Sequence, residues 1–504
     1  MLSDFYVLLL TNNKQKLYSM QQHISFVLDG KIQKLDFNEQ LSPTTTVLNY
    51  LRKSAAHKGV KEGCAEGDCG ACTIVIGELN KEQKINYNAI DSCLVFLPMI
   101  HGKQLITVEN LKQQKGNVDV LHPVQQQMVD CNGSQCGYCT PGIVMSMFAL
   151  YKSENNPSKE VIEDALTGNL CRCTGYKPII EATAKACVNN GEDHFVQNEQ
   201  HIIDLLLQIK NDNSSLVINT NTQKYFQPKT KAEVFELRES MQNSVLISGA
   251  TDVALRVTKR HEVLTEIIDL SNVDELKKCT HTDYLIKFGA GMSLEEVKQI
   301  AKEELPALYE TLAIFGSKQI RSLATFGGNL GSGSPIGDTL PVLMAYNAEI
   351  KLQSKDGDRI INMNHFILGY RQTERKPNEI ITSVIINKPS ANTKIKFYKV
   401  SKRKDLDIST VSAGFSLTLN KNKVDAIILA FGGMAATTKR ATEAEVFLTA
   451  NEWTRENIEQ AMEMIQRAFT PITDARSGAE YRSIAAKNLL LKFWNETSKE
   501  ILTT

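Results

Sequence analysis

The sequence has little proline, no long apolar run and no excess of charge of either sign. Its 504 residues include 13 prolines and 29 glycines, too few for a fibrous or low-complexity chain. The apolar runs at 5–10 and 202–209 are far shorter than the roughly 20 residues that a membrane-spanning helix needs. Because 57 basic residues balance 57 acidic ones, no net positive charge attracts nucleic acid or an anionic membrane. We therefore expect neither as a partner.

The first residues also lack the features of a secretory signal. Asp4 stands where such a signal carries Lys or Arg, and the apolar run that follows is too short. We therefore expect a cytoplasmic protein. A composition of 42% hydrophobic and 23% charged residues is that of a globular chain, and the length suggests about three domains.

Cysteine is the residue type with the most uneven distribution. Ten of the 11 cysteines lie between Cys64 and Cys187, and only Cys279 lies beyond them. In a reducing compartment such a concentration indicates metal or redox chemistry rather than disulfides. The first third of the chain is therefore the predicted site of metal chemistry.

The first cysteine motif has the spacing of a plant-type [2Fe-2S] loop. Cys64, Cys69 and Cys72 form C-x4-C-x2-C, and Cys93 follows after twenty intervening residues. Soft thiolates suit iron bridged by sulfide, and the interspersed glycines allow the backbone to wrap closely around a cluster. A zinc site is the alternative, but zinc sites usually pair two C-x2-C knuckles.

The second motif combines two short cysteine pairs. Cys136 and Cys139 are separated by two residues, and Cys171 and Cys173 by one. Taken alone, these four residues could also bind zinc. The single-residue spacing is tighter than that of zinc knuckles, and helical stretches beside each pair can stabilise an anionic cluster.

Together these motifs resemble the molybdenum hydroxylase family, and within it the iron–sulfur/FAD small subunits of bacterial-type split xanthine dehydrogenases. The resemblance implies one cluster in a β-grasp ferredoxin domain and another in a four-helix domain. It implies that the first cluster is held by Cys64, Cys69, Cys72 and Cys93, and the second by Cys136, Cys139, Cys171 and Cys173. Cys131, Cys187 and Cys279 receive no ligand role.

The rest of the chain contains two candidate phosphate cradles but neither a G-x-G-x-x-G after a strand nor a P-loop. One is 324–343, a predicted loop with five glycines between Gly327 and Gly337. The other is 245–255, a strand that runs into a Gly-Ala-Thr-Asp turn. Backbone N–H groups in such turns can bind a pyrophosphate.

Both segments resemble the FAD domain of the same family, which shares its fold with the carbon monoxide dehydrogenase flavoprotein and vanillyl-alcohol oxidase. Lys399 has an alternative interpretation, because with its basic neighbours it also fits a solvated turn. The resemblance implies an FAD site formed by Leu246, Ile247, Ser248, Gly249, Ala250, Thr251, Asp252, Val253, Phe315, Thr325, Phe326, Gly327, Gly328, Asn329, Ser332, Asp338, Ile381 and Lys399.

We therefore predict an α+β multidomain protein. Residues 93–98 should form a strand of the first domain, and the second domain should be helical. The predicted pieces are a ferredoxin-like domain at 22–103, a helical [2Fe-2S] domain at 104–188, an irregular linker at 189–215, an FAD-binding domain at 216–390 and a C-terminal flavoprotein subdomain at 391–504.

No stretch of this sequence is left for a molybdopterin domain, so the resemblance implies a partner subunit that carries it, in a heterotetramer of two small and two large chains. Hydroxylation of hypoxanthine or xanthine to urate would occur there, with no catalytic residue for it in this chain. Electrons would pass through the helical-domain cluster, the ferredoxin-like cluster and FAD to NAD. The alternatives are a split hydroxylase of an aldehyde, a nicotinate-type heterocycle or an aromatic acyl thioester, and a zinc-stabilised adaptor.

Overall fold

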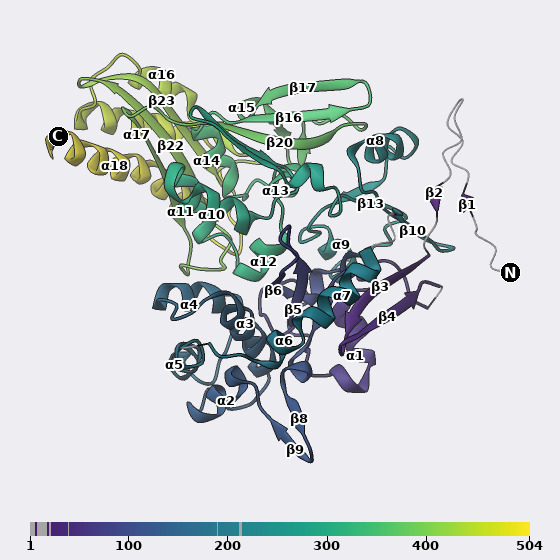
Figure 1. The fold of residues 1–504 in the computed structure, drawn as a ribbon. Helices are drawn as coiled ribbons and strands as arrows, with labels where there is room; N and C mark the ends of the chain where they lie inside the picture. Colours follow the sequence, from purple (N-terminus) through teal and green to yellow (C-terminus); the bar gives the residue numbers. More distant parts are fainter. Residues whose placement is uncertain are drawn as a thin grey trace. The chain divides into compact units, whose positions relative to one another are not determined.

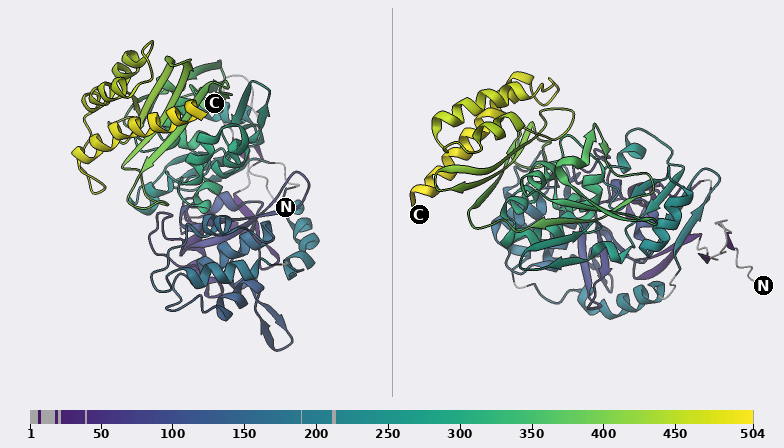
Figure 2. Two further views of the ribbon diagram at one scale, coloured as in Figure 1. Left: turned by 90° about the vertical axis from the view of Figure 1, so that its left-hand side faces the viewer. Right: turned by 90° about the horizontal axis from the view of Figure 1, so that it is seen from above.

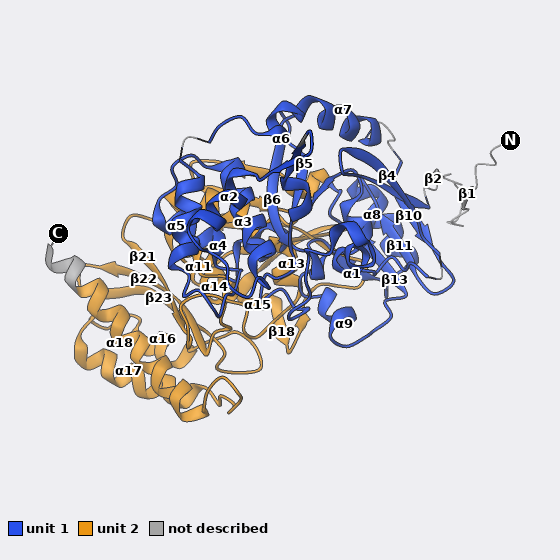
Figure 3. Cartoon of the chain, turned by 90° about the horizontal axis from the view of Figure 1, so that it is seen from below, with its two compact units in different colours: residues 1–273, 316–324 blue, residues 274–315, 325–504 orange. Residues whose placement is uncertain are grey.

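The chain folds into two compact units in a computed structural model (Figure 3). The structure describes residues 6–7, 18–19, 22–38, 40–188, 190–210 and 214–503. Unit 1 comprises Met1–Val273 and Gly316–Ala324, and unit 2 comprises Asp274–Phe315 and Thr325–Thr504. The chain therefore crosses from one unit to the other three times.

After the short strand pair β1 (Tyr6–Val7) and β2 (Tyr18–Ser19), unit 1 contains a mixed five-stranded sheet in the order β4-β3-β7-β5-β6 (Figure 1). Asp29 and Gly30, both at positive φ, form the turn of the first hairpin, as the sequence predicts. Thr46 caps α1 by accepting a hydrogen bond from the Asn49 N–H. The elements are β3 (His23–Leu28), β4 (Lys31–Asp36), α1 (Val47–Lys53), η1 (Ala55–His57), β5 (Thr73–Leu79), β6 (Ile85–Asp91) and β7 (Gln104–Ile106).

Alternation along β5 divides the core of unit 1 into two layers. Ile74 and Ile76 lie in the cluster that contains α1, whereas Val75 lies in the cluster of the helical module. Successive side chains of a strand point to opposite faces, so both faces of this sheet are covered. The sheet therefore fixes the two modules to each other.

The helical module contains four main helices, as predicted, and also a small hairpin that the sequence analysis missed. The hairpin, β8 and β9, extends from the module (Figure 1). The elements are η4 (Val108–Leu111), β8 (Gln113–Lys115), β9 (Val118–Val120), α2 (Pro123–Asp130), α3 (Thr140–Ser153), α4 (Lys159–Leu166) and α5 (Lys177–Ala186).

The stretch predicted as an irregular linker is largely helical. It contains α6 (His194–Gln197) and α7 (Glu199–Lys210). Ile202, Leu206 and Ile209 of α7 are buried in a cluster with residues of the first sheet. An apolar face at helical spacing outweighed the polar residues around it.

The first half of the flavin region belongs to unit 1 and shares its core. Ile247 and Ala254 lie in the same buried cluster as Leu94 of the ferredoxin-like module. The sheet order is β10-β11-β13-β12. The elements are β10 (Leu216–Asn219), β11 (Lys224–Gln227), α8 (Lys231–Ser240), β12 (Val245–Ile247), α9 (Ala254–Thr258), β13 (Glu266–Asp269) and, after the excursion into unit 2, α12 (Lys318–Leu323).

Unit 2 contains the five-stranded sheet β14-β15-β20-β16-β17 with helices around it. Its elements are η5 (Asp274–Lys277), β14 (Cys279–His281), β15 (Leu285–Gly289), α10 (Leu294–Glu304), α11 (Pro306–Ala313), α13 (Phe326–Gly331), α14 (Thr339–Ala345), β16 (Glu349–Ser354), β17 (Gly357–Asn362), α15 (Met363–Phe366), β18 (Ile367–Gly369), β19 (Gln372–Thr373) and β20 (Ile380–Asn387).

The C-terminal part of unit 2 is an antiparallel sheet, β21-β22-β23-β24, with α17 and α18 over one face (Figure 2). Phe415, Leu429, Ile458 and Leu490 are fully buried in the core between them. The elements are β21 (Thr393–Val400), β22 (Val411–Asn420), β23 (Lys423–Gly432), β24 (Lys439–Arg440), α16 (Thr442–Leu448), α17 (Arg455–Ala468) and α18 (Ala479–Thr503). The predicted α+β class is confirmed.

Two local predictions are wrong. Residues 93–98 form no strand but lie in and between the 3₁₀ helices η2 (Ser92–Leu94) and η3 (Leu97–Ile100). Their burial gives an apolar run that resembles a strand, although Pro98 removes a ladder donor. The glycine-rich segment is also not simply a loop, because Thr325 caps α13 and the glycines of its first half lie in that helix.

No helix in the described ranges is long and apolar enough to span a membrane. Most of the N-terminal stretch used to judge the absence of a signal, including Asp4, lies outside the described residues. The same holds for residue 189 and residues 211–213 of the predicted linker.

Candidate iron–sulfur and flavin sites

The first four cysteines lie in unit 1 as two pairs. The Sγ atoms of Cys72 and Cys93 are 3.4 Å apart, and both side chains are buried. The thiols of Cys64 and Cys69 are hydrogen-bonded to each other. A binuclear cluster needs two thiolates for each iron, so two pairs are the arrangement that suits it.

Backbone donors face the outer pair. The N–H groups of Glu66 and Asp68 donate to Cys64 Sγ at 3.4 and 3.3 Å. The hydrogen bond from Cys69, followed by these N–H groups, lowers the pKa of the Cys64 thiol to about 5 despite partial burial. A thiolate is the form that binds iron, so Cys64 is held in the ligating state, whereas the hydrogen bond with Cys64 and burial raise the pKa of Cys69.

A buried carboxyl accompanies the inner pair. Asp91 is fully buried, and its Oδ1 accepts a long hydrogen bond of 3.8 Å from Cys72 Sγ. Burial, with a smaller contribution from Cys64, raises the pKa of Asp91 to about 8. The carboxyl is therefore mainly neutral at pH 7 and adds little charge beside these thiols.

The second four cysteines also form two pairs, but these are more exposed. Cys136 hydrogen-bonds with Cys173, and Cys139 with Cys171. Cys136 and Cys173 are exposed, whereas Cys171 is buried. The backbone N–H of Tyr138, with Cys173, lowers the pKa of Cys136, while burial and Cys171 raise that of Cys139 to about 12.

The cysteine donor set fits two binuclear clusters better than a single metal ion. Across the described ranges, no three His, Cys, Asp or Glu side chains converge on one point. Each set instead offers two thiol pairs, and each pair matches one iron of a binuclear cluster. A mononuclear zinc site would need four ligands around one centre.

The two cysteine loops touch each other directly. Leu170 N–H donates to Cys69 O at 3.0 Å, and Asn169 Nδ2 donates to Gly70 O at 3.0 Å. The approach requires glycine: a Cβ at Gly142 would lie 2.1 Å from Gly70 O, and a Cβ at Gly70 would lie 2.2 Å from a backbone oxygen. Both cysteine sets therefore belong to one hydrogen-bonded core.

Helix α12, which comes from the flavin half of the sequence, completes this core. Gln319 is fully buried, and its Nε2 donates to Ser146 Oγ at 2.8 Å and to Asn169 Oδ1 at 2.9 Å. Arg321, also fully buried, donates to Asp164 at 2.6 Å. The sequence analysis did not identify these residues, because polar residues in a short helix carry no motif.

The first predicted flavin segment, Leu246–Val253, forms the end of β12 and the turn before α9. Ala250 adopts φ +58°, and a Cβ at Gly249 would lie 1.7 Å from Leu323 O. The Ser248 hydroxyl oxygen is buried and hydrogen-bonds to no described group. A buried hydroxyl without a protein partner is what a ligand-binding turn leaves behind, so this observation fits FAD.

The second predicted flavin segment begins at the Thr325 cap in unit 2. A Cβ at Gly327 would lie 2.5 Å from the Cβ of Ala290, so the fold itself requires that glycine. A Cβ at Gly328 would lie 2.8 Å from Thr325 Oγ1, which accepts a hydrogen bond from the Gly328 N–H at 3.2 Å. A Cβ at Gly331, one turn later, would lie 3.6 Å from Ile381. The Thr325 cap and the bare backbone at Gly328 form the second candidate phosphate cradle.

Asp338 and Lys399 form a buried ion pair in unit 2. Lys399 Nζ lies 2.9 Å from Asp338 Oδ2, and Ser409 Oγ donates to Asp338 Oδ1 at 2.5 Å. The side chains are only 6% and 3% exposed for Asp338 and Lys399. Lys399 is therefore not a solvated turn residue, and Ser409 is a partner that sequence reasoning missed.

Other predicted residues of unit 2 are held by local contacts. Asn329 accepts a hydrogen bond from Thr339, and Ser332 Oγ donates to Asn329 O at 2.7 Å. Phe326 packs edge-on against Phe288. Phe315 is half-buried at the end of the first unit 2 segment. The predicted flavin residues thus occur in both units, with Leu246–Val253 in unit 1 and the rest in unit 2.

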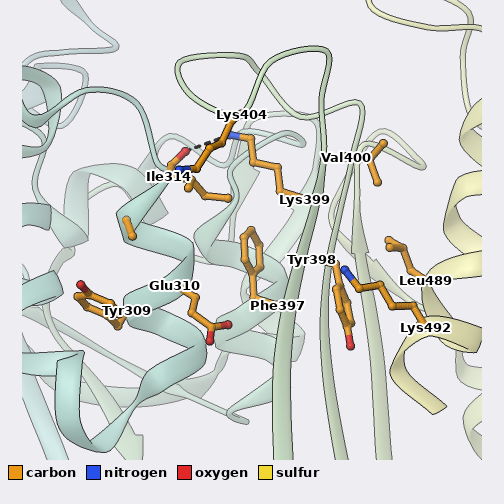
Figure 4. Close-up of a pocket in the computed structure, with 11 residues that line it drawn as sticks. Tyr309, Glu310, Ile314, Phe397, Tyr398, Lys399, Val400, Lys404, Leu489 and Lys492 are labelled. Atoms are coloured by element: carbon orange, nitrogen blue, oxygen red, sulfur yellow. Dashed lines mark hydrogen bonds between the residues drawn. The ribbon is translucent and has the colours of Figure 1, made fainter. Parts of the chain in front are cut away.

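Lys399 also lies beside a pocket of unit 2 with a volume of about 520 Å³ (Figure 4). The ammonium donates to Ile314 O at 3.2 Å. Apolar side chains of α11, β21 and α18 contribute most of the lining, with Lys404 and Lys492 among the charged groups.

Comparison with known proteins agrees with these sites. Residues 28–97 match a 2Fe-2S iron–sulfur cluster binding domain, and residues 107–184 match a second [2Fe-2S] binding domain. Residues 219–389 match the FAD binding domain in molybdopterin dehydrogenase, and residues 396–497 match the CO dehydrogenase flavoprotein C-terminal domain. Two [2Fe-2S] domains and an FAD-binding domain are therefore present.

Xanthine dehydrogenase of Emericella nidulans is 32% identical over 538 residues, which cover 95% of this chain. The chain belongs to the molybdenum hydroxylase family. It spans 39% of the length of that relative. Its matched segments are iron–sulfur and flavin domains of that family.

Chains of solved structures share the fold over about half of this chain. A chain of carbon monoxide dehydrogenase from Hydrogenophaga pseudoflava aligns with TM-score 0.51 and 23% identity, over 53% of this chain and 93% of the other. A chain of quinoline 2-oxidoreductase from Pseudomonas putida 86 aligns with TM-score 0.51 and 21% identity, over 55% and 97%. The predicted fold and family are confirmed, whereas the named enzymes differ in substrate.

Proposed function

We propose that this chain is the electron-transfer subunit of a xanthine dehydrogenase. Its electrons would come from a molybdopterin subunit that oxidises hypoxanthine or xanthine to urate, and would leave through FAD to NAD. The single observation that carries this proposal is the hydrogen-bonded core in which both cysteine sets and α12 meet. The 32% identity to a xanthine dehydrogenase supports the substrate.

The cysteine pairs supply the metal ligands in this proposal. Each pair would hold one iron, so the chain would bind about four irons in two clusters. When bound, the clusters transfer single electrons, and the flavin converts these to the two-electron chemistry that NAD requires. No residue of this chain acts in the hydroxylation.

The burial of the cysteines supports the order of transfer. Cys136 and Cys173 are exposed, so an electron donor can approach the second set. Cys93 lies in η2, which contacts α9, the helix that follows the predicted flavin turn. The first set therefore lies beside a flavin segment, which fits transfer from the second cluster to the first and then to FAD.

The residues of the flavin site would have different binding roles. In unit 1, the turn at Ser248 would bind phosphate through N–H groups and a hydroxyl, and in unit 2 the segment that begins at Thr325 would offer its bare glycine backbone to the flavin cofactor. The buried Asp338 carboxylate, held by Lys399 and Ser409, would accept a hydrogen bond from a sugar or ribityl hydroxyl. These roles carry over from the family resemblance, and the orphan Ser248 hydroxyl supports them.

The substrate and the assembly are the parts of the proposal that depend on the partner subunit. We propose a heterotetramer of two small and two large chains. A carbon monoxide or quinoline-type hydroxylase is the second candidate, because chains of such enzymes share the flavoprotein fold. Product analysis with hypoxanthine, xanthine and quinoline, with NAD present and absent, distinguishes them. Urate and NADH are the products we expect.

Gly328→Val tests the flavin exit. A branched side chain beside the Thr325 cap should remove FAD while leaving about four irons per chain. Substrate should then reduce the iron–sulfur clusters but form no NADH. Gly478→Val is the matched control, since nothing lies within 4 Å of its Cβ position and it is far along the chain from the flavin segments. Normal NADH formation by an FAD-free Gly328→Val enzyme would refute the proposed route.

A further inference from the structure

Two lysines donate to the backbone of the cysteine loops, one to each loop. Lys259 Nζ donates to Cys64 O at 2.9 Å, and it lies 3.4 Å from the carboxylate of Glu66. Lys61 Nζ donates to Gly137 O at 3.0 Å, between Cys136 and Cys139, and lies over the Tyr138 ring. Each cysteine loop thus receives one ammonium group on a main-chain carbonyl.

Neither lysine belongs to the loop that it contacts. Lys259 follows α9 in the flavin half of the sequence. Lys61 precedes the first cysteine motif but reaches the second loop. The positive charge beside each cysteine loop therefore comes from another part of the fold.

The charge of the first loop shows why the contact by Lys259 matters. Residues 62–72 contain three acids, Glu62, Glu66 and Asp68, and no Lys or Arg. Lys259 thus brings an external cation to a loop whose own charges are negative. The second loop differs, because residues 132–142 carry no charge and Arg172 separates its other two cysteines.

We propose that Lys259 and Lys61 raise the reduction potentials of the first and second clusters. The inference rests on the proposed function, because it requires both clusters. Each cluster gains one electron on reduction, as one ferric iron becomes ferrous, and its charge becomes more negative by one. A nearby ammonium stabilises the more negative form, so the cluster accepts an electron from the donor more readily.

The expected size follows from the positions of the charges. Lys259 is 44% exposed, so water and salt screen it partly. At a fixed solution potential, we expect Lys259→Met to lower the ratio of reduced to oxidised first cluster by about three- to tenfold. A tenfold change corresponds to about 59 mV for a one-electron couple. The second cluster should change less.

Lys61→Met should show the reverse preference, with the larger fall in the second cluster. Glu66→Gln removes a negative charge beside the first set while retaining Lys259, so it should make the first cluster easier to reduce. Lys259→Arg keeps the charge and should leave the potential close to that of the parent. These opposite signs cannot come from a general loss of packing.

Lys224→Met is the matched control. Lys224 pairs with Glu266 at 3.5 Å and is 51% exposed, which closely resembles the geometry of Lys259 with Glu66. It lies in β11 of unit 1, and its partner Glu266 belongs to the neighbouring strand β13 rather than to a cysteine loop. Its removal changes the net charge by the same amount and should shift neither cluster.

The experiment is a mediated redox titration of the full chain with its bound partner, followed by electron paramagnetic resonance at low and high salt. Signals are assigned with Cys69→Ser and Cys136→Ser. A cluster-selective fall in Lys259→Met that shrinks with salt, and a rise in Glu66→Gln, would support the proposal. Unchanged potentials, or equal shifts of both clusters, would overturn it. Absence of the iron signals in the parent would instead refute the proposed function.

Discussion

The two cysteine sets differ most in how far the protein covers them. In the first set, Cys72 and Cys93 are 2% and 1% exposed and belong to the core that joins the ferredoxin-like sheet to the flavin region. The other two cysteines of this set, Cys64 and Cys69, are half-buried. In the second set, Cys171 is buried and Cys139 half-buried, but Cys136 and Cys173 are exposed. The same ligand type therefore occurs in two environments within one unit.

This difference in burial supports the proposed order of electron transfer. An electron reaches a buried centre through neighbouring groups of the protein, whereas an exposed centre can accept electrons from another chain. The buried pair of the first set lies beside α9, which follows a predicted flavin segment, and the exposed pair of the second set is accessible within this chain. Burial also strengthens the effect of nearby charges on a cluster.

The largest expected effect comes from removing one ligand of each set. Cys72→Ser should eliminate the first cluster and also weaken the shared core, because its side chain is buried there. Cys136→Ser should eliminate the second cluster with little effect on the fold, because its side chain is exposed. Iron analysis should give about two irons per chain in either case, and thermal unfolding should separate the variants.

Cys279→Ser is the control for this experiment, because Cys279 is exposed in unit 2 and belongs to neither set. It should retain about four irons and the parent melting temperature. Loss of both clusters from Cys136→Ser would show that the exposed set is as essential to the fold as the buried one. The comparison between the two sets would then lose its basis.

Sequence reasoning could group the cysteines into two sets because ligand spacing is local information. The motifs placed eight cysteines in two sets, and the structure brings each set together as two pairs. The hairpin at Asp29 and the cap at Thr46 were also predictable from turn and capping preferences. The β-rich character of the first module followed from these local signals.

The parts that sequence reasoning missed depend on contacts between distant segments. Gln319 lies far along the chain from Asn169, yet the two share a buried hydrogen bond. The apolar run after Cys93 suggested a strand, but it forms 3₁₀ helices that turn Cys93 toward Cys72. Tertiary packing decided both cases, and no local pattern reports it.

A second prediction concerns the rate at which iron is lost. In the chain without its partner, an iron chelator added after mild oxidation should remove the second cluster about tenfold faster than the first, since buried ligands require an opening of the core. Electron paramagnetic resonance of samples quenched and reduced at intervals measures both rates. Addition of the molybdopterin partner should slow loss of the second cluster only. Equal rates without the partner would contradict the difference in cover.

Substitution of Asp193 should have the smallest effect on the clusters but a measurable effect on the stability of the helical module. This carboxylate accepts hydrogen bonds from His122 Nε2 and Lys152 Nζ, both at 3.1 Å, and its side chain is 3% exposed. Val124 N–H donates to His122 Nδ1, so the proton of a neutral His122 lies on Nε2 and points to Asp193. The network holds the start of α6 against the helical module.

Burial alone would raise the pKa of Asp193. The hydrogen bonds from His122 and the Val196 N–H, together with the Lys152 charge, have the larger effect and lower the pKa below its usual value. A depressed pKa means that the folded state binds the proton more weakly than the unfolded state. The contribution to stability is therefore complete above the unfolded pKa of about 3.9 and declines as the pH falls below it.

Asp193→Asn should therefore reduce the free energy of unfolding of the helical module by about 3 kcal/mol at pH 7, because it leaves the Lys152 charge buried without a counter-ion. The difference from the parent should persist at pH 5 and narrow below about pH 4. Denaturant unfolding followed by circular dichroism measures this difference.

Asp119→Asn, which breaks an exposed pair with Lys112 in the same module, should cost less than about 1 kcal/mol. Both variants should keep both clusters at pH 7, since neither carboxylate contacts a cysteine. A gap that widened in acid would show that Asp193 is protonated in the folded protein and that the network is held by hydrogen bonds alone.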